Sequence, residues 1–116
     1  MKQYFLFLYE SPGAFDTISP EEMQKIVARY IAWRGDVAAK GHMLGGNKLR
    51  DGEGRVMRAA DGKVSVTDGP FAENKEVIAG YFHIQAESYD QAVDIARTCP
   101  HMDFGVIEIR EMEITH

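Results

Sequence analysis

The sequence predicts an α+β domain in which two helices cover one face of a mostly antiparallel sheet. Strand-like alternation occurs near both ends of the chain. Helix-start signals follow such strands at residues 19–22 (Ser-Pro-Glu-Glu) and 88–91 (Ser-Tyr-Asp-Gln). Short strands joined by glycine-containing turns lie between them. The resulting order, β-α-β, a β-meander and β-α-β, fits helices packed on one side of one sheet.

The first expected strand, residues 4–9, is apolar on both of its alternating faces, so we expect it to be covered on both sides. The first helix is expected over residues 20–40. Ser19 is its N-cap, Pro20 takes the first helical position, and Gly41 ends it with a left-handed cap. Its apolar residues recur at helical spacing, at Met23, Ile26, Val27, Tyr30, Ile31, Val37 and Ala38.

The middle of the chain predicts a protruding β-meander. Residues 43–50 and 55–59 form short strands around a polar turn, and the hairpin signal Asp61-Gly62 leads into a strand at residues 63–67.

A longer strand is expected over residues 77–85, followed by a helix that opens after Ser88 and stops at Pro100. The last strand is expected over residues 106–114. The apolar stripe of this second helix consists of Tyr89, Ala92, Ile95, Ala96 and Cys99.

One layer of helices leaves the second sheet face bare. In the last strand Ile107 and Ile109 point toward the helices, so the residues alternating with them form part of the bare face, which also includes Tyr81. Large apolar surfaces of this kind mark association. We therefore expect a homodimer that joins the two sheets. The alternating residues are Val106, Glu108, Arg110 and Met112.

Length and composition bound the class of protein. With 116 residues and 45% hydrophobic residues, the chain is expected to be a single domain over residues 1–116. A net charge of −5 disfavours nucleic acid or an anionic membrane as partner. No apolar run approaches the roughly 20 residues of a membrane span, and the single cysteine, Cys99, agrees with a reducing compartment. We expect a cytoplasmic protein.

The segment from 66 to 80 concentrates turn signals and charge. In Asp68-Gly69-Pro70, the aspartate can bond the backbone ahead, glycine accepts positive φ and proline fixes φ. A rigid loop would hold its charged residues in a fixed geometry. The other interpretation is a solvated hairpin. The charged residues are Asp68, Glu73, Lys75 and Glu76.

The same segment resembles the signature of the YCII-related family, in the branch named for its Asp-Gly-Pro-Phe motif. The matching residues are 68–73 (Asp-Gly-Pro-Phe-Ala-Glu), 75–76 and 80–81, and the likeness extends to the opening strand, Cys99-Pro100 and residues 105–110. The motif loop comprises Gly69, Pro70, Phe71, Glu73, Lys75 and Glu76.

This resemblance implies a ferredoxin-like fold that dimerises into an α/β barrel. It also implies two classes of function, because some relatives are small lyase-like or dehalogenating enzymes and others lie beside or are fused to alternative sigma factors. YciI-like relatives are thought to use a His/Asp pair with the histidine in the first helix. Residues 20–40 contain no histidine, so that pair is not carried over.

Two residues are predicted to be catalytic. Asp68 lies in the fixed turn, where its alternative role is an Asx-turn without chemistry. His101 follows a helix end, which favours the imidazolium and suits an acid/base near neutral pH. Its alternative role is to cap the helix at the surface. Cys99, on the apolar stripe, is expected to be a buried, inert thiol.

Four residues are predicted to bind a ligand: Tyr81, His83, Glu108 and Arg110. Glu108 and Arg110 project from one strand face, and Arg110 could hold a carboxylate or phosphate through two bonds. Their alternative role is a salt bridge across the dimer. No residues have metal-ligand spacing, and no cofactor is expected.

Two functions follow. The first is a cofactor-free, lyase- or isomerase-like enzyme acting on a small organic acid. The second is a non-catalytic module that binds a small ligand or a partner and serves a transcription regulator. A crystal structure with residual density in the pocket would separate them best.

Overall fold

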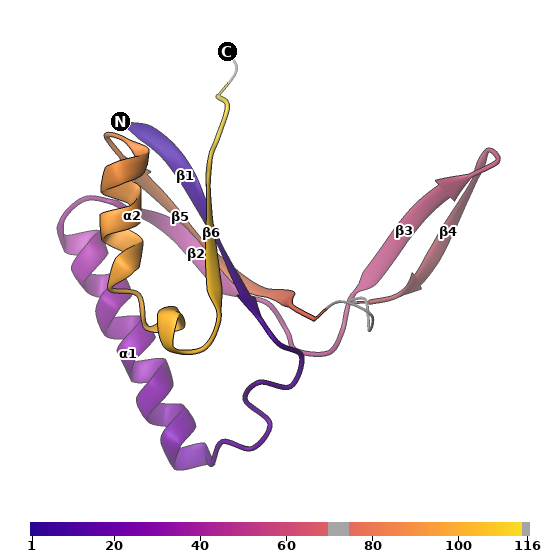
Figure 1. Cartoon of the computed structure of the whole chain (residues 1–116), viewed down its shortest axis with the longest axis horizontal. Coiled ribbons are helices and arrows are strands. Elements are labelled where there is room, and N and C mark those ends of the chain that lie inside the picture. The colour runs from indigo at the N-terminus through magenta and orange to yellow at the C-terminus, as the bar shows by residue number, and fades with distance from the viewer. Residues whose placement is uncertain (70–74, 115–116) are drawn as a thin grey trace.

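A computed structural model describes residues 1–69 and 75–114 of the chain. The main sheet has the strand order β2-β5-β1-β6, and every neighbouring pair in it is antiparallel (Figure 1). The predicted α+β, ferredoxin-like arrangement is confirmed. The elements are β1 (Lys2–Glu10), α1 (Pro20–Ala39), β2 (Met43–Lys48), β3 (Arg55–Ala60), β4 (Lys63–Asp68), β5 (Val77–Ala86), α2 (Tyr89–Arg97), the 3-10 helix η1 (Pro100–Asp103) and β6 (Val106–Glu111).

The core lies between the helices and one face of the sheet. Burial alternates along β1 and β5, as expected for strands with only one face covered by their own chain. Trp33 of α1 meets Phe82 of β5 edge to face, with ring centroids 4.9 Å apart. The buried hydrophobic residues are Tyr4, Leu6, Leu8, Trp33, Val37, Phe82, Ile84, Ala86, Ala92, Ala96 and Cys99.

Both helices begin where the capping signals place them. The Ser19 Oγ accepts a hydrogen bond from the Glu22 amide at 3.2 Å, and the Ser88 Oγ accepts one from the Gln91 amide at 3.2 Å. After α1 the chain turns at Gly41, whose φ of 82° is the left-handed value predicted for it. No helix of the described residues is both long and apolar enough to cross a membrane.

The prediction that residues 43–50 belong to the protruding meander is wrong. β2 does not join β3 but is an edge strand of the main sheet, paired with β5. Gly46 makes this possible, because a Cβ there would lie 2.5 Å from Cδ1 of Phe82 and 2.8 Å from the carbonyl oxygen of Tyr81. The side-chain-free position lets β2 lie close against β5.

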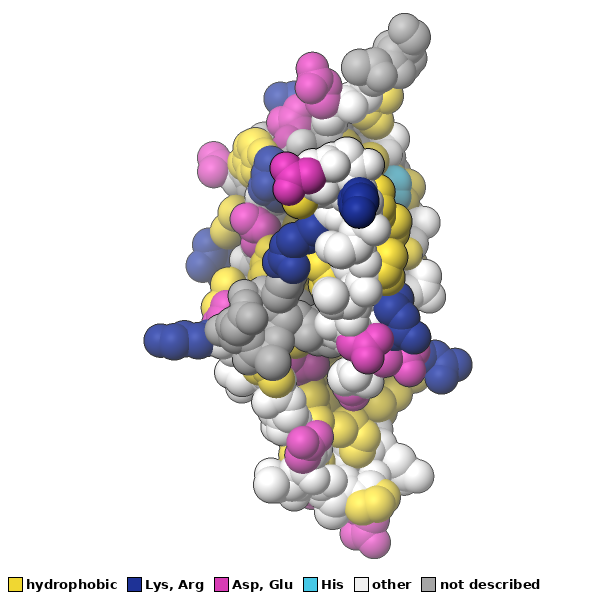
Figure 2. All heavy atoms as spheres, turned by 90° about the vertical axis from the view of Figure 1, so that its right-hand side faces the viewer, with side chains coloured by type: hydrophobic (Ala, Val, Ile, Leu, Met, Phe, Trp, Pro, Cys, Tyr) yellow, Lys and Arg dark blue, Asp and Glu magenta, His cyan; other side chains and the backbone are white. Residues whose placement is uncertain are grey.

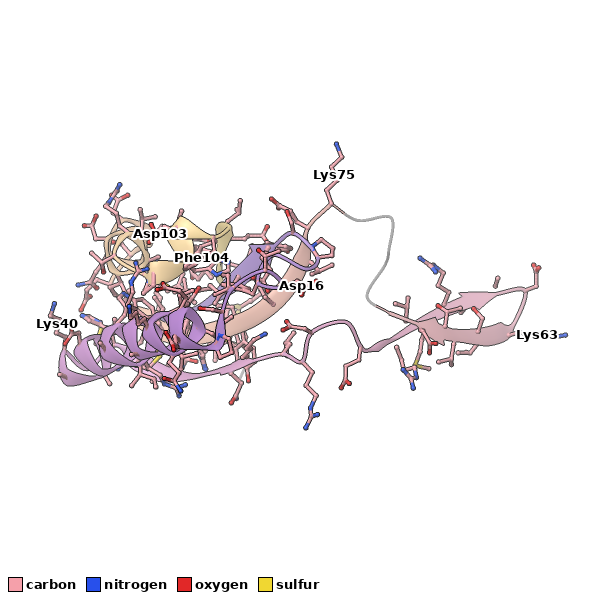
Figure 3. The ribbon with its side chains drawn as sticks, turned by 90° about the horizontal axis from the view of Figure 1, so that it is seen from below. Asp16, Lys40, Lys63, Lys75, Asp103 and Phe104 are labelled. Atoms are coloured by element: carbon pink, nitrogen blue, oxygen red, sulfur yellow. The ribbon has the colours of Figure 1, made fainter. Side chains whose placement is uncertain are left out.

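β3 and β4 alone form the protrusion, a hairpin that we call the arm (Figure 1). Its turn has positive φ at Asp61 and Gly62, at 53° and 76°, as the Asp-Gly signal predicts. Lys63 lies at the tip, well away from the labelled residues of the body (Figure 3).

The arm is amphipathic. Residues directly opposite each other in an antiparallel pair share a face. Pairs Met57–Val66 and Ala59–Val64 therefore make one apolar face, while Arg58–Ser65 lies on the other. Met57 and Val64 are 67% and 62% exposed. Viewed from the arm side, basic and acidic groups are interspersed with hydrophobic ones and form no single-sign patch (Figure 2).

The sheet face opposite the helices carries an aromatic cluster, which we call the open face. Phe5 lies at its centre, with ring centroids 5.5 Å from Phe7, 5.6 Å from Tyr81 and 5.1 Å from His83. β6 adds Glu108 and Arg110, which pair in register with Phe7 and Phe5. These side chains alternate with the core residues, as the sequence predicted.

Candidate functional site

A cavity of about 260 Å³ lies between α1 and the sheet. Its walls are largely apolar, and polar side chains enter it from α1, β1, β2 and η1. We call it the α1 cavity. Apolar lining comes from Leu8, Phe15, Met23, Ile26, Val27 and Phe82, and the polar groups that matter below are Glu10, Tyr30, Arg34, Lys48, Asp51 and His101.

His101 is fixed by hydrogen bonds at both ring nitrogens. Its Nε2 lies 2.7 Å from the carbonyl oxygen of Tyr9, and its Nδ1 lies 3.0 Å from the hydroxyl of Tyr30. A carbonyl oxygen only accepts, so Nε2 carries the proton. In the neutral ring Nδ1 is then the acceptor, and the Tyr30 hydroxyl donates to it.

Burial sets the charge state of this pair. It lowers the pKa of His101 below the ordinary value of 6.5, although the bond to the Tyr9 carbonyl acts in the opposite direction. Burial also raises the pKa of Tyr30 above its ordinary value of 10.0. A neutral phenol therefore donates to a neutral imidazole.

The chain places His101 by a close approach at Gly105. A Cβ at this position would lie 2.9 Å from the His101 Nε2 and would collide with the Tyr9 carbonyl oxygen. The Gly105 amide also donates to the His101 carbonyl at 2.9 Å. An ion pair of 2.6 Å between Arg29 and Asp103 ties η1 to α1. His101 is 2% exposed, so the alternative of a surface cap is wrong.

Glu10 is the second buried ionisable group of the cavity. It is 6% exposed, and burial raises the pKa of its carboxyl above 4.5, with Lys48 acting in the opposite direction. No described residue hydrogen-bonds its Oε2. A second cavity of about 560 Å³, at the base of the arm, also borders Glu10.

The sequence analysis missed Glu10 and Tyr30 as site residues. Glu10 has the same strand parity as Tyr4, Leu6 and Leu8, so an acidic side chain on the buried face was the available signal. The expected strand ended one residue too early to show it. Tyr30 was assigned only to the apolar stripe of the helix.

The predicted ligand-binding residues lie on the open face. The His83 Nε2 is 2.8 Å from the Gln3 Oε1, and the Glu108 Oε1 accepts from the Tyr9 hydroxyl at 3.0 Å. Arg110 is exposed on the same face. Tyr81 accepts from Asn47 at 3.2 Å and also contributes to the α1 cavity wall. The structure thus separates most of this group from His101, which faces the helices.

The described residues of the motif loop, Gly69, Lys75 and Glu76, lie at the base of the arm. The side chain of Asp68 is 92% exposed, and its carboxylate lies 3.3 Å from Arg55. Gly69 is buried, whereas Glu76 and Lys75 are exposed, and Lys75 points away from the body (Figure 3). The predictions for Pro70, Phe71 and Glu73 fall outside the described residues.

Among residues 1–69 and 75–114, no group of three or more His, Cys, Asp or Glu could hold a metal ion.

The catalytic role of Asp68 stays a prediction, and its exposed ion pair makes it testable. An exposed pair contributes about 0–1 kcal/mol, so Asp68→Asn should leave the melting temperature nearly unchanged. A loss of ligand binding in this variant would then report on the carboxylate itself. Arg55→Gln is the matched control, because it breaks the same ion pair and keeps the carboxylate. Equal ligand affinities in the two variants, measured by calorimetry, would contradict a binding role for Asp68.

Comparisons with known proteins agree with the fold. The family model described as YCII-related domain matches residues 2–114. The uncharacterized protein R00369 of Rhizobium meliloti (strain 1021) is 37% identical over 61 residues, which cover 51% of this chain and 49% of that protein. The matched region therefore spans about half the length of that relative.

A solved structure is similar over most of its length. It is 5-chloro-2-hydroxyhydroquinone dehydrochlorinase (TftG) from Burkholderia phenoliruptrix AC1100, in complex with 2,5-dihydroxybenzoquinone. The TM-score is 0.55 at 13% identity, over 96% of this chain and 93% of that chain. At this identity the likeness concerns the fold. Because the family model covers nearly all of the sequence, this chain belongs to the YCII-related domain family.

Proposed function

We propose that the chain is a cofactor-free enzyme that transfers protons on a small organic acid bound in the α1 cavity. The observation that carries the proposal is the Tyr30–His101 hydrogen bond of 3.0 Å at the cavity wall. Support also comes from the solved relative, whose name is that of an enzyme acting on a small molecule. Tyr30 is the catalytic residue, and His101 acts through it.

The proposed step balances without a cofactor. The Tyr30 oxygen takes a proton from the ligand while the Tyr30 hydroxyl proton moves to Nδ1 of His101. The imidazolium that forms keeps its Nε2–H bond to the Tyr9 carbonyl. Reversal returns a proton to a different ligand atom, which gives an isomerisation. If a leaving group departs with its electron pair first, it takes a proton from the Tyr30 hydroxyl while His101 returns its own proton to Tyr30, and the product is that of an elimination.

The test measures hydrogen exchange on the ligand, so the reaction product does not have to be known. A panel of organic acids is incubated with the protein in D₂O, and exchange of ligand C–H for C–D is followed by NMR. Tyr30→Phe removes the hydroxyl, so we expect exchange to fall by about 10²–10⁴-fold, the usual contribution of a positioned acid/base. Ligand affinity should change far less.

Tyr89→Phe is the control for Tyr30→Phe. The Tyr89 hydroxyl accepts from the Glu111 amide at 2.8 Å, and Tyr89 does not line the α1 cavity. We expect exchange at the wild-type rate in this variant. A wild-type protein that binds a ligand and exchanges none of its protons would contradict the enzyme and favour the ligand-binding module.

Exchange should also depend on pH in a defined direction. The step requires a neutral His101, whose pKa lies below 6.5. The rate should therefore persist below pH 6.5 and fall as pH drops through the lowered value. Stability follows the same sign, because the unfolded histidine takes up a proton at a higher pH than the folded one.

The assembly proposed with this function is a homodimer joined through the open face. Support comes from the aromatic cluster around Phe5, which the chain's own helices do not cover. Burying such a cluster against its symmetric copy removes apolar surface from water.

A further inference from the structure

Glu10 has an unmatched polar atom in a largely apolar cavity. The residue is 6% exposed, and no described residue hydrogen-bonds its Oε2. Leaving a buried acceptor unpaired destabilises the folded protein. A bound ligand with a hydrogen-bonding group would satisfy this atom.

We propose that the α1 cavity binds a single-ring monocarboxylate that carries a hydroxyl or keto oxygen, with that oxygen against Glu10 and the carboxylate against Arg34 and Lys48. The proposal uses the cavity of the proposed function and names its ligand class. It concerns binding, so it holds or fails apart from proton transfer.

The inner end of the ligand is set by Glu10 and Tyr30. The Tyr30 hydroxyl donates to His101, so its oxygen can still accept a hydrogen bond. The carboxyl group of Glu10 donates when protonated and accepts in either state. A ligand hydroxyl can satisfy both residues at once, because it can donate to the Tyr30 oxygen and accept from the protonated carboxyl group of Glu10.

The outer end is set by the exposed cations of the cavity wall. Arg34 is held by a bond of 2.9 Å from its NH1 to the Gly46 carbonyl, which leaves the other guanidinium N–H groups for a carboxylate. The Lys48 Nζ lies 2.8 Å from Asp51. With Glu10 protonated, Arg34 and Lys48 against Asp51 give the wall one net positive charge, which suits one carboxylate.

The size and lining of the cavity favour a flat apolar body. A volume of about 260 Å³ lies just below the roughly 300 Å³ at which pockets for drug-sized ligands begin. Phe15 and Phe82 line it, and aromatic faces pack well against a ring. One ring with two short substituents fits these limits.

Binding should weaken as pH rises. The ionisable or charged groups that face Glu10 across the cavity are Tyr30 and Arg34 of α1, Lys48 of β2, Asp51, Tyr81 of β5 and His101 of η1. Burial raises the pKa of Glu10 above 4.5, so above that shifted value the site gains a negative charge that repels an anion. The affinity for a monocarboxylate is therefore highest on the acidic side.

The ligand class is tested by calorimetry with three probes. These are 4-hydroxybenzoate, which has both ends, benzoate, which lacks the inner hydroxyl, and phenol, which lacks the carboxylate. We expect 4-hydroxybenzoate to bind at least tenfold more tightly than either of the others. Equal affinity for all three, or no binding of any, would overturn the proposal.

Variants of Glu10 and Arg34 test which residue binds each end of the ligand. Glu10→Gln keeps the shape and cannot ionise, so 4-hydroxybenzoate affinity should lose its dependence on pH above the shifted Glu10 value. Arg34→Met should lower the affinity for both carboxylates tenfold or more and leave phenol unchanged. Lys25→Met is the matched control on the same helix, because Lys25 pairs with the exposed Glu22 and does not line the cavity. Equal losses in the Arg34 and Lys25 variants, or unchanged pH dependence in Glu10→Gln, would contradict the assignment.

The melting temperature of Glu10→Gln and proton exchange in D₂O test the proposal further. Glu10→Gln should raise the melting temperature more at neutral than at acid pH, because a carboxyl with a raised pKa loses its stabilising contribution as pH rises. A rise of equal size at both pH values would contradict a Glu10 carboxyl whose pKa is raised by burial. Selective probe binding without proton exchange in D₂O would uphold the ligand class while the proposed function failed.

Discussion

Gly105→Ala is expected to destabilise the protein more than alanine at any other described glycine, because its added Cβ meets the closest backbone atom. The added Cβ would collide with the carbonyl oxygen of Tyr9 and lie 2.9 Å from the His101 Nε2. The first obstacle is backbone, which cannot rotate away, so β1, β6 or η1 must shift. Overpacking of this kind costs about 1–3 kcal/mol and occasionally more, and the placement of His101 would be lost with it.

Urea unfolding at neutral pH measures this effect. Gly35→Ala is the matched control, since apart from its two chain neighbours and the backbone of α1 itself nothing lies within 4 Å of the Cβ position at Gly35. In a helix interior alanine is favoured over glycine by about 0.5–1 kcal/mol, so this variant should be stabilised. The two substitutions add the same methyl group and should change stability in opposite directions. A Gly105→Ala protein as stable as the wild type would mean that β1 and η1 are not as close as described.

Phe5→Glu is expected to separate the proposed homodimer into monomers. Phe5 contacts Phe7, Tyr81 and His83 at the centre of the open face. Loss of a central aromatic contact costs about 2 kcal/mol or more, and a two-fold interface loses it twice. The dissociation constant should then rise by roughly 10³-fold, since each 1.4 kcal/mol is a factor of ten.

Sedimentation at micromolar concentration checks the assembly. Val93→Glu is the control, because Val93 is a partly exposed apolar residue of α2, on the helix side of the sheet. It should leave the sedimentation coefficient unchanged. A wild-type protein that sediments as a monomer would refute the dimer.

Local signals predicted most of the fold. Ser19 and Ser88 marked the helix starts, Asp61-Gly62 marked the hairpin, and the alternation along the last strand separated its core face from its open face. β2 was misplaced because edge pairing is a long-range choice. It depends on the room that Gly46 leaves for Phe82, and no neighbour in the sequence shows that room.

The site was harder to predict than the fold. Asp68 stood out because its turn is conspicuous in the sequence, yet its side chain projects into solvent beside Arg55. Glu10 and Tyr30 carry no motif, and their importance comes from burial and from several elements, distant in the sequence, that meet around one cavity. His101 was found by its position after the helix. Its two hydrogen-bond partners, Tyr9 and Tyr30, are 92 and 71 residues away in the chain.

The end of β1 joins the two faces of the sheet through a single residue. The Tyr9 side chain bonds Glu108 on the open face, and the Tyr9 carbonyl fixes the protonated nitrogen of His101 on the helix side. A rotation of the peptide between Tyr9 and Glu10 moves both the acceptor of His101 and the start of the buried carboxyl residue. Strain applied at the open face thus reaches both proton-carrying groups within one peptide unit. A contact between subunits at Tyr9 or Glu108 would therefore change the pKa values of His101 and Glu10 inside the cavity.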